Sequence, residues 1–137
     1  MKREIKFRAW DKKTECYLYN IQDAYDTLSG HVKYDDGENA CYDEDCFGDF
    51  LDNERYVAEQ FTGLKDKNGR EIYEGDVLDI GLLNQDGNPI LAPVSYEAYL
   101  AGYVLYNEGH GIWQRIGGGC EVIGNIYENP ELMEADK

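Results

Sequence analysis

The stretch QFTGLKDKNGREIYEGDVLDI, from Gln60 to Ile80, contains the residue types that bind calcium in proteins. An EF-hand loop needs oxygen ligands at positions one, three and five, a glycine at position six and a bidentate Glu at position twelve. If Asp66 stands at position one, Asn68 falls at position three, but the glycine, Gly69, falls at position four. Val77 then stands where the Glu is needed. The spacing therefore does not predict a calcium loop.

The cysteines and histidines do not predict a zinc site. Zinc sites use ligand pairs at short spacings, such as two C-x2-C knuckles, and the closest cysteines here are Cys41 and Cys46. The other candidate ligands lie far from that pair in the sequence: Cys16, Cys120, His31 and His110. The first ten residues, MKREIKFRAW, lack the apolar stretch of a secretory signal. We therefore expect a cytoplasmic protein with free thiols and no bound metal.

Motifs for catalysis or phosphate binding are not found either. GGGC at 117–120 lacks the GxxxxGK[ST] spacing, and EGHGIW at 108–113 lacks the G-x-G-x-x-G spacing. Ser29 and Ser95 lie in no G-x-S-x-G elbow. Carboxylate pairs are uninformative in a chain with 28 acidic residues. The sequence therefore predicts no enzyme, no cofactor and no catalytic residue.

The net charge of −15 limits the kinds of partner. A protein that binds nucleic acid neutralises phosphates with clustered Lys and Arg, and this chain has 13 basic residues. Its twelve tyrosines could stack on bases only beside a basic groove, so we expect them to pack on a sheet. The chain contains no stretch of 18 apolar residues that would predict a transmembrane helix. We therefore expect neither direct nucleic-acid binding nor a membrane partner.

Acidic residues concentrate in the segment 21–60, which carries twelve acidic and two basic groups. An acidic surface can bind a basic protein, or can replace a nucleic acid in the groove of a DNA-binding protein, but it can also be no more than a solvated face. The candidate acidic interaction surface comprises Asp35, Asp36, Asp43, Glu44, Asp45, Asp49 and Asp52.

The first half of the chain predicts a β-hairpin followed by an irregular segment. REIKFRAW alternates apolar and polar residues, which is typical of a half-buried strand, with Lys6 and Arg8 on the solvent side. With the polar turn Asp11–Thr14 and the ECYLYNI that comes after it, this strand predicts a hairpin over residues 3–21. Periodicity is poor from Gln22 to Asn53, where only DAYDTL and CFGDFLDN favour short helical turns.

The second half predicts several short strands in a small barrel or curled sheet. The turn Asn68-Gly69 joins two short elements, Gly75-Asp76 makes a second turn, and Leu64, Ile72 and Val77 are expected to anchor this region in the core. Proline lacks a backbone N–H, so Pro89 and Pro93 predict that PILAPV is at best an edge strand. Further strands are expected in YLAGYVLYN, IWQRI and EVIGNIY, and one helical turn in ENPELMEADK.

Three blocks of the sequence together resemble the YopX family of bacteriophage and prophage proteins. They are MKREIKFRAWDKKT at Met1–Thr14, QFTGLKDKNGREIYEGDVL at Gln60–Leu78, and EVIGNIYENPELM at Glu121–Met133. The resemblance implies a mainly β protein with an N-terminal hairpin and a C-terminal half similar to an SH3-type barrel. It also implies a phage-encoded intracellular protein, and it brings no catalytic or ligand residues.

The 137 residues suit one domain, with an N-terminal part at 1–59 and a barrel part at 60–137. Two kinds of function are considered for it. The first is a non-enzymatic accessory protein of a phage or prophage that acts through protein contacts, with an unknown protein partner or as a homo-oligomer. The second is an acidic mimic of nucleic acid that inhibits a host DNA-binding or defence protein.

Overall fold

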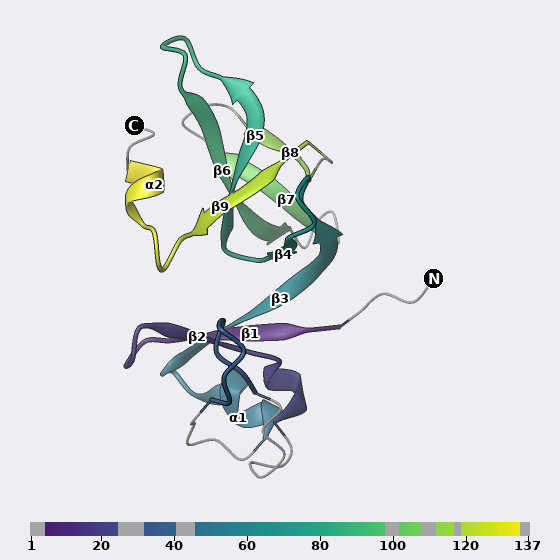
Figure 1. Cartoon of the computed structure of the whole chain (residues 1–137), viewed down its shortest axis with the longest axis vertical. Coiled ribbons are helices and arrows are strands. Elements are labelled where there is room, and N and C mark those ends of the chain that lie inside the picture. Colours follow the sequence, from purple (N-terminus) through teal and green to yellow (C-terminus); the bar gives the residue numbers. More distant parts are fainter. Residues whose placement is uncertain are drawn as a thin grey trace. The chain divides into compact units, whose positions relative to one another are not determined.

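The computed structural model describes residues 5–24, 32–40, 46–97, 102–107, 112–116 and 119–134, and half of them lie in strands (Figure 1). The prediction of a mainly β fold is confirmed. The elements in chain order are β1 (Phe7–Asp11), β2 (Cys16–Tyr19), a 3-10 turn η1 (Ile21–Asp23), α1 (Phe47–Asp52), β3 (Tyr56–Lys65), β4 (Glu71–Tyr73), β5 (Asp76–Leu83), β6 (Pro89–Glu97), β7 (Gly102–Asn107), β8 (Ile112–Arg115), β9 (Glu121–Asn125) and α2 (Glu131–Glu134).

The chain divides into two compact units, Met1–Phe61 and Thr62–Lys137. The long strand β3 begins in the first unit and ends in the second. Among the described residues, no helix is both long enough and apolar enough to cross a bilayer.

The first unit is built on a hairpin whose strand β1 lies between β2 and the start of β3. Ala9 faces Leu18 on one side and Ala58 on the other, so the predicted hairpin is confirmed over its described residues. Phe50 of α1 is fully buried and its ring centroid lies 4.8 Å from that of Tyr56. The predicted helical turn in CFGDFLDN is thus α1. Most of DAYDTL lies outside the described residues.

The prediction that Arg8 lies on the solvent side of its strand is wrong. Arg8 is buried, its Nε donates to Glu59 Oε1 at 2.9 Å, and its guanidinium lies 4.2 Å from the centroid of the Tyr17 ring. The strand does alternate, but β2 and β3 flank it and their aromatic and acidic side chains cover the second face too. Arg8 therefore supports the sheet internally, where its charge is compensated by Glu59.

The second unit is a curled antiparallel sheet in the order β8-β7-β6-β5-β9, which forms a half-barrel. Its core is apolar and comprises Ile72, Leu78, Ile80, Ala92, Val94, Leu105, Cys120 and Val122. Two of the three expected anchors, Ile72 and Val77, are fully buried. The third, Leu64, is 47% exposed, so its prediction as an anchor is wrong. It lies just after Gly63, whose φ is +90° and which redirects the end of β3.

The prediction that the proline-containing segment PILAPV is at best an edge strand is also wrong, because β6 lies inside the sheet. The pairing explains how the prolines are accommodated. Pro89 and Pro93 pair with β5, whereas the register with β7 begins at Val94 and runs to Glu97. Each proline therefore has a paired neighbour on one side of the strand, and the missing N–H is tolerated as it would be at an edge.

Asp66 connects the turn between β3 and β4 to strand β9. One carboxylate oxygen accepts the backbone N–H groups of Asn68 and Arg70, and the other accepts that of Val122, each at 2.9 Å. The N–H of Lys67 also donates to the carbonyl of Cys120. Burial alone would raise the pKa of Asp66, but these three N–H groups and the Arg70 charge hold the pKa below its ordinary value of 3.8.

Replacing Asp66 by Asn should lower the free energy of unfolding at pH 7 by about 1–3 kcal/mol, because an amide cannot accept all three N–H groups. The lowered pKa means that the ionised form stabilises the fold above pH 3.8 and that this stabilisation is lost as the pH falls through the folded-state value. The difference between wild type and Asp66→Asn in urea unfolding should therefore shrink below pH 3.8, by at most about 1.4 kcal/mol per pH unit.

The control is Asp86→Asn, which changes an exposed acid in a turn. It should lower the free energy of unfolding by less than about 0.5 kcal/mol at both pH 7 and pH 3. A difference between wild type and Asp66→Asn that stays constant from pH 7 to pH 3 would contradict the role of the Asp66 charge.

Candidate functional site

The described members of the predicted acidic interaction surface lie in two places in the first unit. Asp49 and Asp52 belong to α1 and, with Asn53 and Glu54, line a shallow depression of about 450 Å³. The pair Asp35-Asp36 lies in a separate turn, where Asp36 accepts the backbone N–H of Glu38 at 2.9 Å. The three remaining members, Asp43, Glu44 and Asp45, lie outside the described residues.

Asp11, an acid of the first unit whose pKa is shifted, has a structural role. Asp11 accepts both Nε and a terminal nitrogen of Arg55, at 2.9 and 2.8 Å, as well as the Thr14 hydroxyl. Burial would raise the pKa of Asp11, but Arg55, Thr14 and the backbone N–H groups of the turn hold it well below its ordinary value. Both carboxylate oxygens are occupied by these contacts, which fix the β1–β2 turn against Arg55.

Metal ligands do not cluster in the part of the chain that the structure describes. No group of three or more His, Cys, Asp or Glu side chains there has the proximity to hold an ion. Cys16, Cys46 and Cys120 are free thiols.

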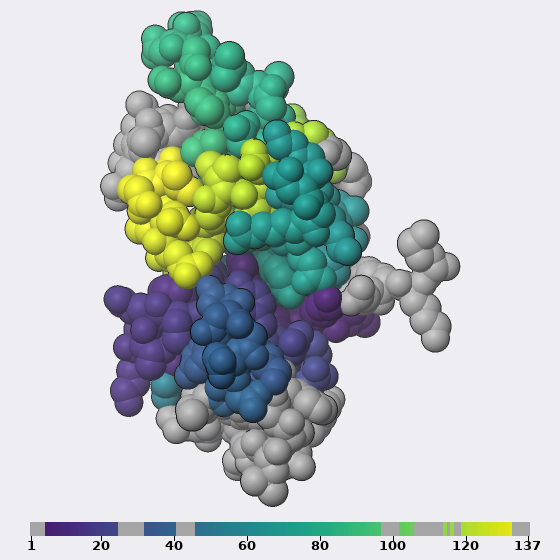
Figure 2. Space-filling model, in the orientation of Figure 1, coloured from purple at the N-terminus to yellow at the C-terminus, as the bar shows by residue number. Residues whose placement is uncertain are grey.

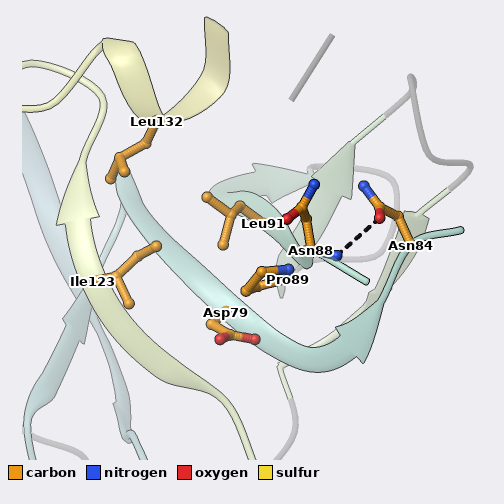
Figure 3. A pocket seen from close by; sticks show the side chains of 7 residues that line it. All are labelled: Asp79, Asn84, Asn88, Pro89, Leu91, Ile123 and Leu132. Atoms are coloured by element: carbon orange, nitrogen blue, oxygen red, sulfur yellow. Dashed lines mark hydrogen bonds between the residues drawn. The ribbon is translucent and has the colours of Figure 1, made fainter. Parts of the chain in front are cut away.

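A concave site in the second unit is a groove of about 480 Å³ (Figure 3). We refer to it as the β5–β6–β9 groove. Its lining combines four apolar side chains with one carboxylate and two amides: Pro89, Leu91, Ile123, Leu132, Asp79, Asn84 and Asn88. In Figure 3 Leu132 and Ile123 lie at one end of the groove and Asn84 lies at the other, with Leu91 and Asn88 side by side between them. Sequence reasoning assigned none of these residues to a site.

Strand alternation places the floor of the groove on the side of the sheet opposite the core. Asp79 lies between Leu78 and Ile80, whose side chains are both in the core. Directly across from Asp79, Leu91 lies between Ile90 and Ala92, which face the core as well. Neighbouring residues of a strand point to opposite faces, so Asp79 and Leu91 emerge side by side on the outer face.

A bulge in β5 shapes the asparagine end of the groove. The register between β5 and β6 shifts between Asp79 and Leu83, and Gly81 in this interval has a φ of +85°, which only glycine adopts at low cost. The carboxylate of Asp79 accepts the N–H of Gly81 at 2.9 Å. At the hairpin tip, Asn84 Oδ1 accepts the N–H groups of Asp86 and Asn88, which holds the turn closed.

The opposite wall is built by the C-terminal segment after β9. Asn125 Oδ1 accepts the N–H groups of Tyr127 and Glu128, and Asn129 Oδ1 accepts the N–H of Asn125 at 3.3 Å. This turn leads into α2, so the predicted helical turn in ENPELMEADK is confirmed. Leu132 of α2 lines the groove, and Figure 2 shows these yellow C-terminal residues against the strand that precedes them.

The absence of a side chain at Gly124 permits this close approach. A Cβ atom at Gly124 would lie 2.5 Å from Asn129 Oδ1 and 2.8 Å from Leu132 Cδ1, both far shorter than ordinary contacts. The glycine therefore sets how closely the wall of the groove can lie on β9.

The groove thus offers an apolar floor, one carboxylate and two side-chain amides. Such a set can bind and orient a ligand, since a few polar groups on an apolar surface supply specificity. Among the described residues, the only hydrogen bond of the Asp79 side chain is the one to Gly81. The second carboxylate oxygen is therefore available to a ligand.

Comparison with known proteins identifies the family. The model of the YopX protein family matches residues 6–134. The chain belongs to the YopX family. The crystal structure of protein EF1440 from Enterococcus faecalis is similar, with 29% sequence identity, a TM-score of 0.60, and coverage of 96% of this chain and 99% of that chain. No curated protein matches the sequence.

Blocks of the sequence that carry the YopX resemblance are distant in the chain but meet in the fold. The backbone N–H of Val122, in the block Glu121–Met133, donates to the carboxylate of Asp66, in the block Gln60–Leu78. The block Glu121–Met133 also supplies Ile123 and Leu132 to the β5–β6–β9 groove. The family match also includes the region 82–119, which carries Pro89, Leu91 and the asparagines of the groove.

The variant Gly124→Ala should displace Asn129 and Leu132 and open the groove wall. We expect a loss of about 1–3 kcal/mol in the free energy of unfolding, because an added methyl group overpacks this contact. The amide resonances of Asn129, Glu131 and Leu132 in ¹H–¹⁵N spectra should shift more than those of the β1–β2 hairpin. Gly119→Ala is the matched control, since a Cβ there has no atom within 4 Å. Equal effects of the two substitutions would contradict the role of Gly124.

Proposed function

We propose that this protein is a non-catalytic accessory protein of a bacteriophage or prophage, and that it acts in the cytoplasm of the bacterial host by binding another protein. The phage origin rests on the resemblance to the YopX family. The observation that supports protein binding is a set of exposed apolar side chains around the β5–β6–β9 groove.

These side chains lie along one hairpin and the strand beside it. Leu82 and Leu83 at the end of β5 are 52% and 66% exposed, and Ile123 on β9 is 38% exposed. Leu83 pairs directly with Pro89, which lines the groove, so Leu83 continues the apolar floor towards the hairpin tip, whereas its strand neighbour Leu82 points to the opposite face. In Figure 2 this tip, coloured teal-green, extends beyond the yellow C-terminal residues.

Contiguous exposed apolar surface supports an interaction function, because such surface costs free energy in water and is stabilised when a partner covers it. Single exposed leucines are common and carry no such implication. Leu83 differs from such single leucines because it is continuous with a groove that also has polar groups for orientation.

Affinity purification of the tagged protein from phage-infected host cells tests the proposal. Wild type should retain a specific host or phage protein, and Leu83→Asp should reduce that retention about tenfold, since a buried leucine contributes about 1.5–3 kcal/mol. The control is Leu64→Asp, which places the same charge at another exposed leucine of the second unit and should leave retention unchanged. Retention that is unaffected by Leu83→Asp, or lost equally in both variants, would contradict binding at this hairpin.

The acidic mimic of nucleic acid is the second candidate, and one observation favours it. Asp49, Asp52 and Glu54 line a single depression in the first unit, so at least part of the predicted acidic set faces a common space. Carboxylates in such an arrangement can take the places of phosphates in the basic groove of a DNA-binding protein.

Competition with duplex DNA separates this candidate from the first. If the protein mimics nucleic acid, it should retain a DNA-binding host protein, and added duplex DNA should displace that protein. The double variant Asp49→Asn/Asp52→Asn should weaken this retention and make it less dependent on salt concentration. The double variant Asp86→Asn/Glu131→Gln removes the same charge from exposed positions of the second unit and should behave as wild type. Retention that duplex DNA does not reduce would contradict mimicry.

A further inference from the structure

We propose that the β5–β6–β9 groove binds an extended peptide segment of the partner in which a lysine or arginine stands beside aliphatic side chains. The inference rests on the proposed function, because it assigns a chemical class to the partner of the same surface. It depends on the composition of the groove and on the charges around it.

The apolar floor specifies aliphatic groups. Strands β6 and β9 and helix α2 supply the apolar lining: Pro89, Leu91, Ile123 and Leu132. Ile123 is more than one-third exposed. The volume of about 480 Å³ lies within the range of about 300–1,000 Å³ that is usual for ligand sites. The exposed Leu83, which pairs with Pro89, extends the apolar surface past the groove, and this suits an extended chain better than a compact molecule.

The carboxylate of Asp79 specifies a cation. It stands on the outer face of the sheet directly across from Leu91, so a group bound to it would also lie against that leucine. One of its oxygens accepts the Gly81 N–H, and the other is available. A lysine or arginine can lay its methylene chain along an apolar floor while its charged end reaches a carboxylate.

The surroundings of the groove contain negative charge. Among the described residues that line the groove, Asp79 is the only charged one, so none of them is a competing cation. Two further acids, Asp86 at the hairpin tip and Glu131 beside Leu132, are exposed. Lys67, a basic residue of the same unit, is paired with Glu121 at 3.6 Å. An anionic ligand would meet uncompensated repulsion here, whereas a basic peptide is attracted.

The asparagines supply contacts that suit a peptide backbone. Asn84 uses its Oδ1 within the hairpin turn, so its side-chain NH₂ is left for a carbonyl of the ligand. Asn88 offers both an amide donor and an acceptor in the same groove. A peptide bond presents the complementary carbonyl and N–H, so this end of the groove suits backbone next to the anchored side chains.

The test uses the full-length ¹⁵N-labelled protein and two synthetic peptides with blocked ends, GLKLKLG and GLELELG. Titration with GLKLKLG should shift the amide resonances of Asp79, Leu91, Ile123 and Leu132 in a saturable manner, and GLELELG should cause no such shifts. Asp79→Asn should weaken binding of GLKLKLG about tenfold, because the amide removes the negative charge that the lysine ammonium would contact. The asparagine keeps the oxygen that accepts the Gly81 N–H, so the bulge is preserved.

Asp86→Asn is the matched control, because it removes one charge from the same hairpin without changing the groove lining, and binding should stay within about twofold of wild type. Equal binding of both peptides, or no effect of Asp79→Asn, would overturn the assignment of a basic ligand. Self-association of the protein that buries Leu91 and Ile123 would overturn the peptide as occupant. If neither peptide binds while Leu83→Asp still abolishes capture of the cellular partner, the peptide assignment is wrong and the proposed function stands.

Discussion

The carboxylate of Asp66 is the interaction on which the architecture of the second unit depends. It binds three backbone N–H groups that belong to two segments more than fifty residues apart, the turn after β3 and strand β9. β9 pairs with β5 along one side, and on the other side Asp66 accepts the N–H of Val122 that would otherwise be buried without a partner. Without this contact the last strand of the sheet would have one unsupported edge, and the C-terminal residues after it would have no fixed base.

The β5–β6–β9 groove depends on that base in two ways. β9 must be held in register with β5 for Val122 to enter the core and Ile123 to emerge on the outer face, because the two side chains alternate. The chain after β9 must also turn back closely enough for Leu132 to form a wall, which Gly124 permits and the paired asparagines Asn125 and Asn129 enforce. The buried carboxylate of Asp66 thus helps to fix β9, which supplies Ile123 to the floor and carries the segment that forms the wall.

Local sequence patterns predicted the strands and turns correctly where short-range rules decide them. Strict alternation predicted the N-terminal hairpin, and Asn-Gly and Gly-Asp pairs predicted the turns on either side of β4. The errors concern the neighbours of an element. Arg8 is buried because β2 and β3 cover its face, and β6 is internal because its two halves pair with different strands. The groove was not predicted for the same reason, since its lining comes from four segments that only the tertiary fold brings together.

The acidity of the chain connects the two candidate functions but does not distinguish them. A net charge of −15 attracts any cationic partner over a distance set by the ionic strength, so both a basic peptide and a DNA-binding protein would bind more weakly in salt. The two candidates differ in the contacts that form after the encounter. A nucleic-acid mimic needs only spaced carboxylates such as those of α1, whereas the β5–β6–β9 groove adds apolar surface whose contribution salt does not screen. Binding that persists at high ionic strength and depends on Leu83 is therefore due to apolar contacts at the groove. Binding that is lost as the salt concentration rises is due to charge alone.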